Sequence, residues 1–120
     1  MSGDIKYAIY EFFYGLNERE LERMSDILTD DIEFYFPKTK PMLGKKSVLT
    51  FFKILFRQFP ELGFTIQHTV IEEGHAAVHW TNKGVSRDGA SYENEGVTLF
   101  KLQGDRLCLA SDFFKNTEKF

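Results

Sequence analysis

Two residues of this chain, Asp112 and His68, carry side chains suited to proton transfer. Each lies in a stretch that alternates apolar and polar residues, a pattern typical of β-strands. We expect both side chains to face an aromatic interior, where a carboxylate and an imidazole together can perform general acid–base catalysis. Loss of water would raise the pKa of Asp112 there, whereas a protonated His68 would lower it. The hypothesis is that Asp112 acts as acid or base and His68 orients it.

The same two side chains also fit a protein without catalysis. A buried aspartate often pairs with a Ser or Thr or caps backbone amides, and a strand histidine often fills space with one hydrogen bond. The alternative is therefore a protein that binds an apolar ligand without changing it, or an interaction module whose pocket is filled by its own phenylalanines.

An aromatic pocket is predicted around Asp112. The chain has 13 Phe among 120 residues, more than a core of this size needs. If Phe36 and Thr98 point inward, strand alternation adds these lining residues: Phe34, Phe64, Trp80, Asn82, Phe100 and Phe114. Phe12 lies on the apolar stripe of the first helix that faces them. Such a lining favours a small apolar or aromatic ligand, bound through burial of apolar area.

The register of the strand over 76–82 allows two arrangements. A three-residue turn before it puts His68 opposite Val78 and turns Trp80 and Asn82 inward, whereas a two-residue turn puts His68 opposite His79. Val78 and Trp80 give this strand one apolar face, and burial of that face favours the arrangement in which Trp80 and Asn82 point inward. The histidines lack the spacing of a zinc site, so neither a metal nor a cofactor is predicted.

The spacing of apolar residues along the chain predicts the helices and strands that position these side chains. Helices are predicted over 5–16, 21–28 and 48–59, and strands over 32–36, 64–71, 76–82, 96–100 and 107–114. This order predicts an α+β fold, a cone-shaped barrel in which three helices of the N-terminal half pack on a curved, mostly antiparallel sheet. The whole chain, 1–120, is expected to form a single domain.

Several short strings strengthen this assignment. They are LTDDI at 28–32, GKKSV at 44–48, VHWTNKG at 78–84, EGVTLF at 95–100 and SDFF at 111–114. With the order of elements, they resemble the nuclear-transport-factor-2-like superfamily, and within it the SnoaL-like and ketosteroid-isomerase-like proteins. The resemblance implies the cone-shaped fold. It does not name a reaction, because the superfamily includes isomerases, polyketide cyclases, epoxide hydrolases, dehydratases and proteins without chemistry.

The catalytic positions of such relatives are mostly altered here. In the steroid isomerases that the chain resembles, a tyrosine and two aspartates act at the positions of Phe12, Thr98 and Phe36. A phenyl ring cannot transfer a proton, so the resemblance argues against that mechanism. Of the charged groups used by similar epoxide hydrolases, only the last aspartate has a match, Asp112. An isomerase, cyclase or dehydratase acting on a carbonyl compound is the enzyme class expected.

Partners and location are predicted from composition. The net charge of −3 argues against nucleic acid, and no apolar run is long enough to span a membrane. A single Cys and no signal-peptide pattern at the start favour the cytoplasm. Val97, Leu99, Leu107 and Leu109 are expected on the outer sheet face, where an exposed apolar patch predicts a homodimer.

Overall fold

The computed structural model describes residues 2–117, with side chains from residue 5 onward. Its helices are α1 (Ser2–Glu18), α2 (Leu21–Asp26) and α3 (Lys45–Gln58). Its strands are β1 (Leu28–Tyr35), β2 (Met42–Leu43), β3 (Glu61–Glu72), β4 (His75–Val85), β5 (Ser91–Gln103) and β6 (Arg106–Phe114). The α+β class predicted from periodicity is confirmed, and the short strand β2 is an addition to it.

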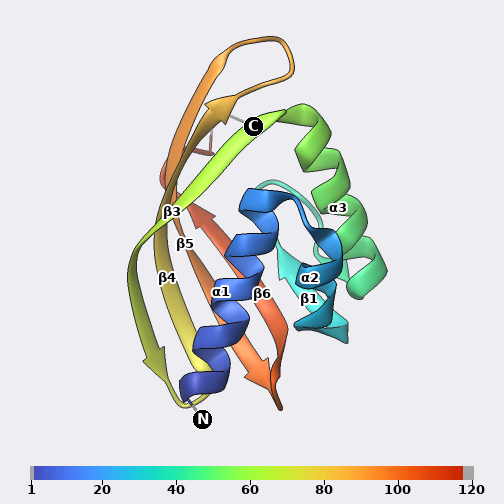
Figure 1. Ribbon diagram of the computed structural model, residues 1–120, viewed down its shortest axis with the longest axis vertical. Coiled ribbons are helices and arrows are strands. Elements are labelled where there is room, and N and C mark those ends of the chain that lie inside the picture. The colour runs from blue at the N-terminus through green and yellow to red at the C-terminus, as the bar shows by residue number, and fades with distance from the viewer. Residues whose placement is uncertain (1, 118–120) are drawn as a thin grey trace.

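The described strands form one curved sheet in the order β2-β1-β6-β5-β4-β3. All neighbouring pairs are antiparallel except β1 and β6, which run parallel. The sheet stays open, with β2 and β3 at its edges. The three helices lie together on one side of it (Figure 1). The concave face and the helices therefore enclose the core, and the other face has no cover from the described chain.

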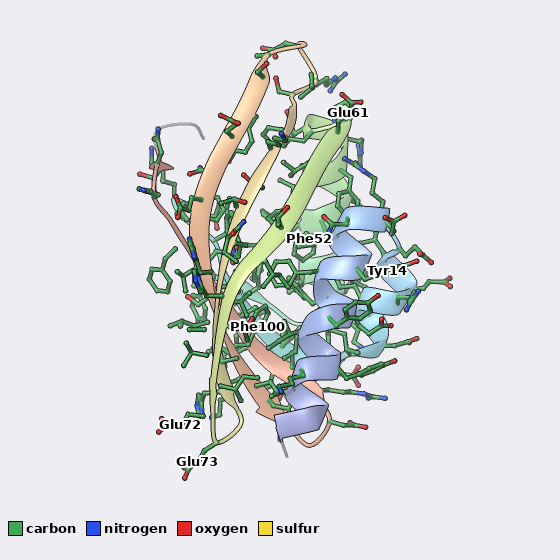
Figure 2. The ribbon with its side chains drawn as sticks, turned by 60° about the vertical axis from the view of Figure 1, so that its left-hand side comes forward. Tyr14, Phe52, Glu61, Glu72, Glu73 and Phe100 are labelled. Atoms are coloured by element: carbon green, nitrogen blue, oxygen red, sulfur yellow. The ribbon has the colours of Figure 1, made fainter. Side chains whose placement is uncertain are left out.

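The helices face the sheet through the apolar stripes that their sequences predict. Ile5, Ala8, Phe12 and Leu16 are buried on α1 because residues three or four apart share one helix face. Phe52 on α3 meets Phe12 edge to face, with ring centroids 5.8 Å apart. Phe52 and Phe100 both point into the space between helices and sheet (Figure 2). Edge-to-face contacts between phenyl rings thus join the helices to one another and to the sheet within the core.

A bulge in β3 sets the direction of the side chains that follow it. Ile66 pairs with Trp80, but His68 pairs with His79, so Gln67 is an extra residue without an opposite partner. An extra residue reverses which face the later side chains reach. The turn before β4 has two residues, since Glu72 pairs with His75. The structure therefore combines features of both arrangements predicted from the sequence. His68 lies opposite His79, as a two-residue turn predicts, and Trp80 faces inward, as the three-residue turn predicts.

A second bulge lies between β5 and β6. Lys101 pairs with Leu109 and Leu102 with Leu107, which leaves Cys108 as the extra residue. Leu107 consequently turns into the core, where it is fully buried. The prediction that Leu107 belongs to the outer face is therefore wrong. Leu109, beyond the bulge, is only partly buried.

The described helices include none that is both long and apolar enough to cross a membrane.

Candidate active site

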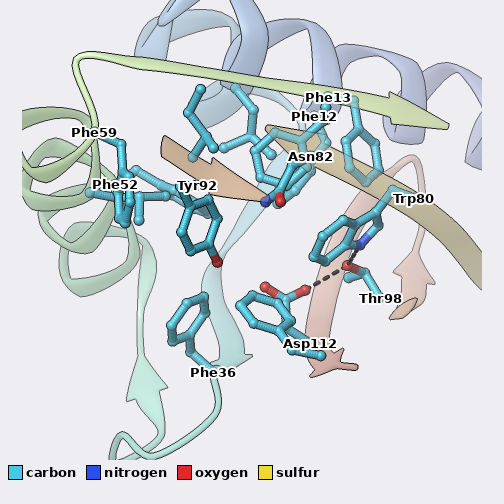
Figure 3. Close-up of a pocket in the computed structure, with 15 residues that line it drawn as sticks. Phe12, Phe13, Phe36, Phe52, Phe59, Trp80, Asn82, Tyr92, Thr98 and Asp112 are labelled. Carbon is cyan, nitrogen blue, oxygen red and sulfur yellow. Dashed lines mark hydrogen bonds between the residues drawn. The ribbon is translucent and has the colours of Figure 1, made fainter. Parts of the chain in front are cut away.

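A narrow cavity opens between α1, α3 and the concave face of the sheet (Figure 3). The space in it that a water-sized group can occupy is about 20 Å³, because its own side chains nearly fill it. Phenyl, indole and aliphatic groups make up most of its wall: Phe12, Phe13, Leu16, Phe36, Phe52, Leu55, Phe59, Leu62, Phe64, Trp80 and Phe114. Four polar side chains complete it: Asn82, Tyr92, Thr98 and Asp112. A concave apolar site with a few polar groups is the usual form of a small-molecule pocket.

Hydrogen bonds fix the carboxyl group of Asp112. The indole Nε1 of Trp80 donates to Oγ1 of Thr98 at 2.8 Å, and Thr98 Oγ1 donates to Asp112 Oδ1 at 2.5 Å. An indole N–H can only donate, so it occupies a lone pair of the hydroxyl and directs the hydroxyl proton toward Asp112. One carboxyl oxygen is thereby held, and the other remains available to the cavity (Figure 3).

The surroundings of Asp112 favour its neutral form. Asp112 is half-buried and lies in the wall of the cavity among aromatic side chains. Burial raises the pKa of the Asp112 carboxyl to about 7, and the hydrogen bond from Thr98 opposes this rise with a smaller effect. Near neutral pH the group is therefore present both as acid and as base.

Two other polar side chains face the same space. Asn82 is 6% exposed, and its Oδ1 has no hydrogen-bond partner. The hydroxyl of Tyr92 accepts a hydrogen bond of 3.2 Å from Asn94, and burial raises the pKa of Tyr92 above its ordinary value while that bond lowers it. Tyr92 and Asn82 both point into the cavity (Figure 3). The cavity thus holds an acid–base group, a hydroxyl and an amide.

The structure places most of the predicted lining residues in this cavity: Phe12, Phe36, Phe64, Trp80, Asn82, Thr98, Asp112 and Phe114. Phe34 and Phe100 are not among them. Each is 1% exposed within the core. Both point to the predicted side of the sheet, but Phe100 packs against Phe12 and Phe13, and Phe34 against Phe52. Phe34 and Phe100 therefore pack behind residues that line the cavity and do not line it themselves.

The predicted pairing of His68 with Asp112 is wrong. His68 is exposed on the outer face, where its ring stacks on His79 with centroids 5.4 Å apart and planes at 6°. The Nδ1 atoms of the two rings are 3.2 Å apart, and His79 Nε2 lies 2.5 Å from Glu95 Oε2. The bulge at Gln67 is the cause, because it turns His68 away from the cavity. Asp112 therefore has Thr98, not an imidazole, as its partner.

Several lining residues were not predicted from the sequence. They are Phe13, Leu16, Phe52, Leu55, Phe59, Leu62 and Tyr92. Tyr92 was recoverable, because it lies an even number of residues before Thr98 on the same strand and so shares its face. The helical residues lie on the predicted apolar stripes, but periodicity cannot separate a cavity wall from a packed core.

The described residues contain no group of three or more His, Cys, Asp or Glu side chains arranged to hold a metal ion.

Comparison with protein families gives one match. The model of the SnoaL-like domain family matches residues 9–110. No curated protein matches the chain.

Solved structures share the fold at low sequence identity. An NTF2-like protein from Anabaena variabilis has a TM-score of 0.86 and 22% identity, over 95% of this chain and 88% of its own. A SnoaL-like polyketide cyclase candidate from Jannaschia has a TM-score of 0.84 and 18% identity, over 95% and 86%. TerC, co-crystallised with polyporic acid, has a TM-score of 0.87 and 17% identity, over 98% and 94%. At these identities the likeness concerns the fold.

Proposed function

Since the chain belongs to the family of SnoaL-like domains, we propose that it binds a small, flat, apolar carbonyl compound in the aromatic cavity and transfers a proton through Asp112. Two fold neighbours support this ligand class, one a polyketide cyclase candidate and the other crystallised with polyporic acid. The reaction fits the isomerase, cyclase or lyase type predicted from the sequence.

One observation carries the proposal: the carboxyl group of Asp112 lies in an apolar cavity with a pKa of about 7. General acid–base catalysis is most efficient when the catalytic pKa is near the working pH. Thr98 holds one carboxyl oxygen, and Trp80 holds Thr98, so the group has a fixed orientation. Pre-set orientation lowers the cost of reaching the reactive geometry.

The chemical step needs only the ligand and this carboxyl group. As a carboxylate, Asp112 removes a proton from the carbon next to the ligand carbonyl. The electron pair of that C–H bond moves toward the carbonyl oxygen and leaves an enolate. Asp112, now neutral, returns a proton to the enolate and becomes a carboxylate again; protonation of the same carbon gives back the ligand, and protonation of another carbon gives its isomer. The apolar wall favours this exchange because the charge is spread into the ligand and the carboxyl becomes neutral.

Hydrogen–deuterium exchange tests the step. The probe is acetylnaphthalene, whose methyl group next to the carbonyl exchanges protons slowly in heavy water. We expect the wild-type protein to speed this exchange, as followed by NMR, and Asp112→Asn to bind the probe without speeding it. Asp105→Asn is the matched control, because Asp105 is exposed in the turn before β6. Binding without exchange in the wild type would support the non-catalytic alternative, and absence of binding would contradict both.

We also propose that two copies associate through the outer face of the sheet. Leu99 is 41% and Phe113 is 56% exposed there, and Val97, two residues before Leu99 on β5, pairs directly with Phe113 on β6. An exposed patch of this kind is commonly covered in a homodimer. The cytoplasmic location and the single-domain organisation expected from the sequence stay predictions.

A further inference from the structure

The carbonyl oxygen of Asn82 is a buried acceptor without a donor. Among the described residues, two buried side-chain polar atoms lack a hydrogen-bond partner, Asn82 Oδ1 and Thr29 Oγ1. Only Asn82 lines the cavity. Leaving a buried acceptor unpaired destabilises the folded protein, so such groups usually have a use.

The neighbouring amides do not supply the missing donor. Asn94 lies opposite Asn82 on β5, but its Nδ2 donates to the hydroxyl of Tyr92 and to the backbone oxygen of Asn116. On the other side, Asn17 Nδ2 donates to the backbone oxygen of Phe64. None of these amides donates to Asn82 Oδ1, which stays unpaired in the wall of the cavity (Figure 3).

Asn82 and Asp112 lie apart on the cavity wall. Asp112 pairs with Thr98, and Thr98 pairs with Val78 on β4. Asn82 is four residues further along β4 than Val78, so its Cα lies roughly 13 Å beyond that of Val78 in the strand direction at the usual rise of a strand. The ring of Trp80 lies between the two levels, since Trp80 is the intervening inward residue. A ligand that reaches both groups must therefore be elongated and must pass the indole ring.

We propose that Asn82 determines ligand specificity by accepting a hydrogen bond from a hydroxyl or N–H group on the ligand, at the end opposite the carbonyl that faces Asp112. The ligand class is then an elongated aromatic hydroxy-carbonyl compound or its amino analogue. This inference rests on the proposed function, because it assumes that the carbonyl end lies at Asp112. A site with a buried acceptor rejects an analogue that lacks the donor, because the acceptor would stay unpaired.

Two probes that differ in one group test the inference. The first is acetylnaphthalene with a hydroxyl group on the far ring, and the second is its methyl ether, which keeps the carbonyl but has no donor. We expect the wild-type protein to bind the hydroxyl probe at least tenfold more tightly, as measured by calorimetry or by probe fluorescence. Asn82→Leu should bind both probes with nearly equal affinity, close to that of the wild type for the methyl ether.

A second variant separates this effect from a general loss of the site. Asp112→Asn should keep the preference for the hydroxyl probe, because its change lies at the carbonyl end. Equal affinity of the wild type for both probes would overturn the role of Asn82 and leave the proposed function intact. If the wild type bound neither probe, the proposed function would fail and this inference with it. The probe comparison on the wild type decides the matter even if Asn82→Leu does not fold.

Discussion

Thr98 and Asp112 face each other directly across β5 and β6, and the hydroxyl of Thr98 donates a 2.5 Å hydrogen bond to the carboxyl group. The bond favours the ionised form of Asp112, whereas burial favours the neutral form. The pKa of this carboxyl is thus set by two opposing effects, and each of them can be changed separately.

Replacing Thr98 by Val removes the hydrogen bond and keeps the shape. We expect the pKa of Asp112 to rise further, so that the pH at half-maximal exchange activity moves up by roughly one pH unit. Carbon-detected NMR of the carboxyl group measures the pKa directly. Thr81→Val is the control, because the Thr81 hydroxyl bonds Gln67 on the outer face. An unchanged or lower pKa in Thr98→Val would contradict this account of the site.

The stability of the protein should depend on pH through Asp112. Its pKa is 3.8 in a model peptide and about 7 in the folded chain, so the folded state binds more protons between these values. Its contribution is therefore fully present below about pH 4 and is lost as the pH rises through about 7. We expect the free energy of unfolding of the wild type, relative to Asp112→Asn, to fall across this range by at most about 4 kcal/mol. Urea denaturation at a series of pH values measures the difference, and parallel curves for the two proteins would refute it.

Gly96 supports the indole ring that holds Thr98. A methyl group there would lie 2.5 Å from the backbone oxygen of Phe113 and 2.7 Å from the ring of Trp80. We expect Gly96→Ala to lower the free energy of unfolding by about 1–3 kcal/mol, since neither contact can be relieved without moving the strand or the indole. At Gly63 nothing lies within 4 Å of the added methyl group, so Gly63→Ala should change stability by less than about 0.5 kcal/mol. Equal effects of the two variants in urea denaturation would contradict the role of Gly96.

The outer sheet face gives a prediction about assembly. Leu99→Lys and Phe113→Lys should turn a dimer into monomers or insoluble protein, because each puts a charge into the proposed contact. Leu43→Lys should leave the dimer intact, since Leu43 is also exposed but lies on the edge strand β2. Light scattering at micromolar concentration measures the assembly state. A wild-type monomer under these conditions would rule out the proposed dimer.

The sequence predicts the helices and the cavity residues best where one apolar face is continuous. The stripe from Ile5 to Leu16 leaves little choice of orientation, because any other would expose several large side chains. β5 carries apolar side chains on both faces, among them Val97 and Leu99 on the outer one, so the inward direction of Thr98 is predicted from the family resemblance and not from alternation alone.

The errors come from two bulges. One extra residue at Gln67 and another at Cys108 reverse the alternation, so His68 turns outward and Leu107 turns inward. Neither position carries a Gly or Pro that would mark a bulge, and a register is set by pairing with distant strands. The parallel pairing of β1 with β6 joins two segments that are far apart in the sequence. The local alternation of apolar and polar residues therefore cannot predict it.

The bulge at Gln67 also matters for how the protein avoids aggregation. β3 is an edge strand of 12 residues, and Val70 on it is 67% exposed. A long, flat edge with apolar side chains offers unpaired backbone groups to another strand. The bulge lies near the middle of this edge and breaks its regular spacing of donors and acceptors, so a straight strand from a second molecule cannot pair along its full length. Gln67, the extra residue that turns His68 away from the cavity, thereby also protects the free β3 edge of the sheet from pairing with another strand.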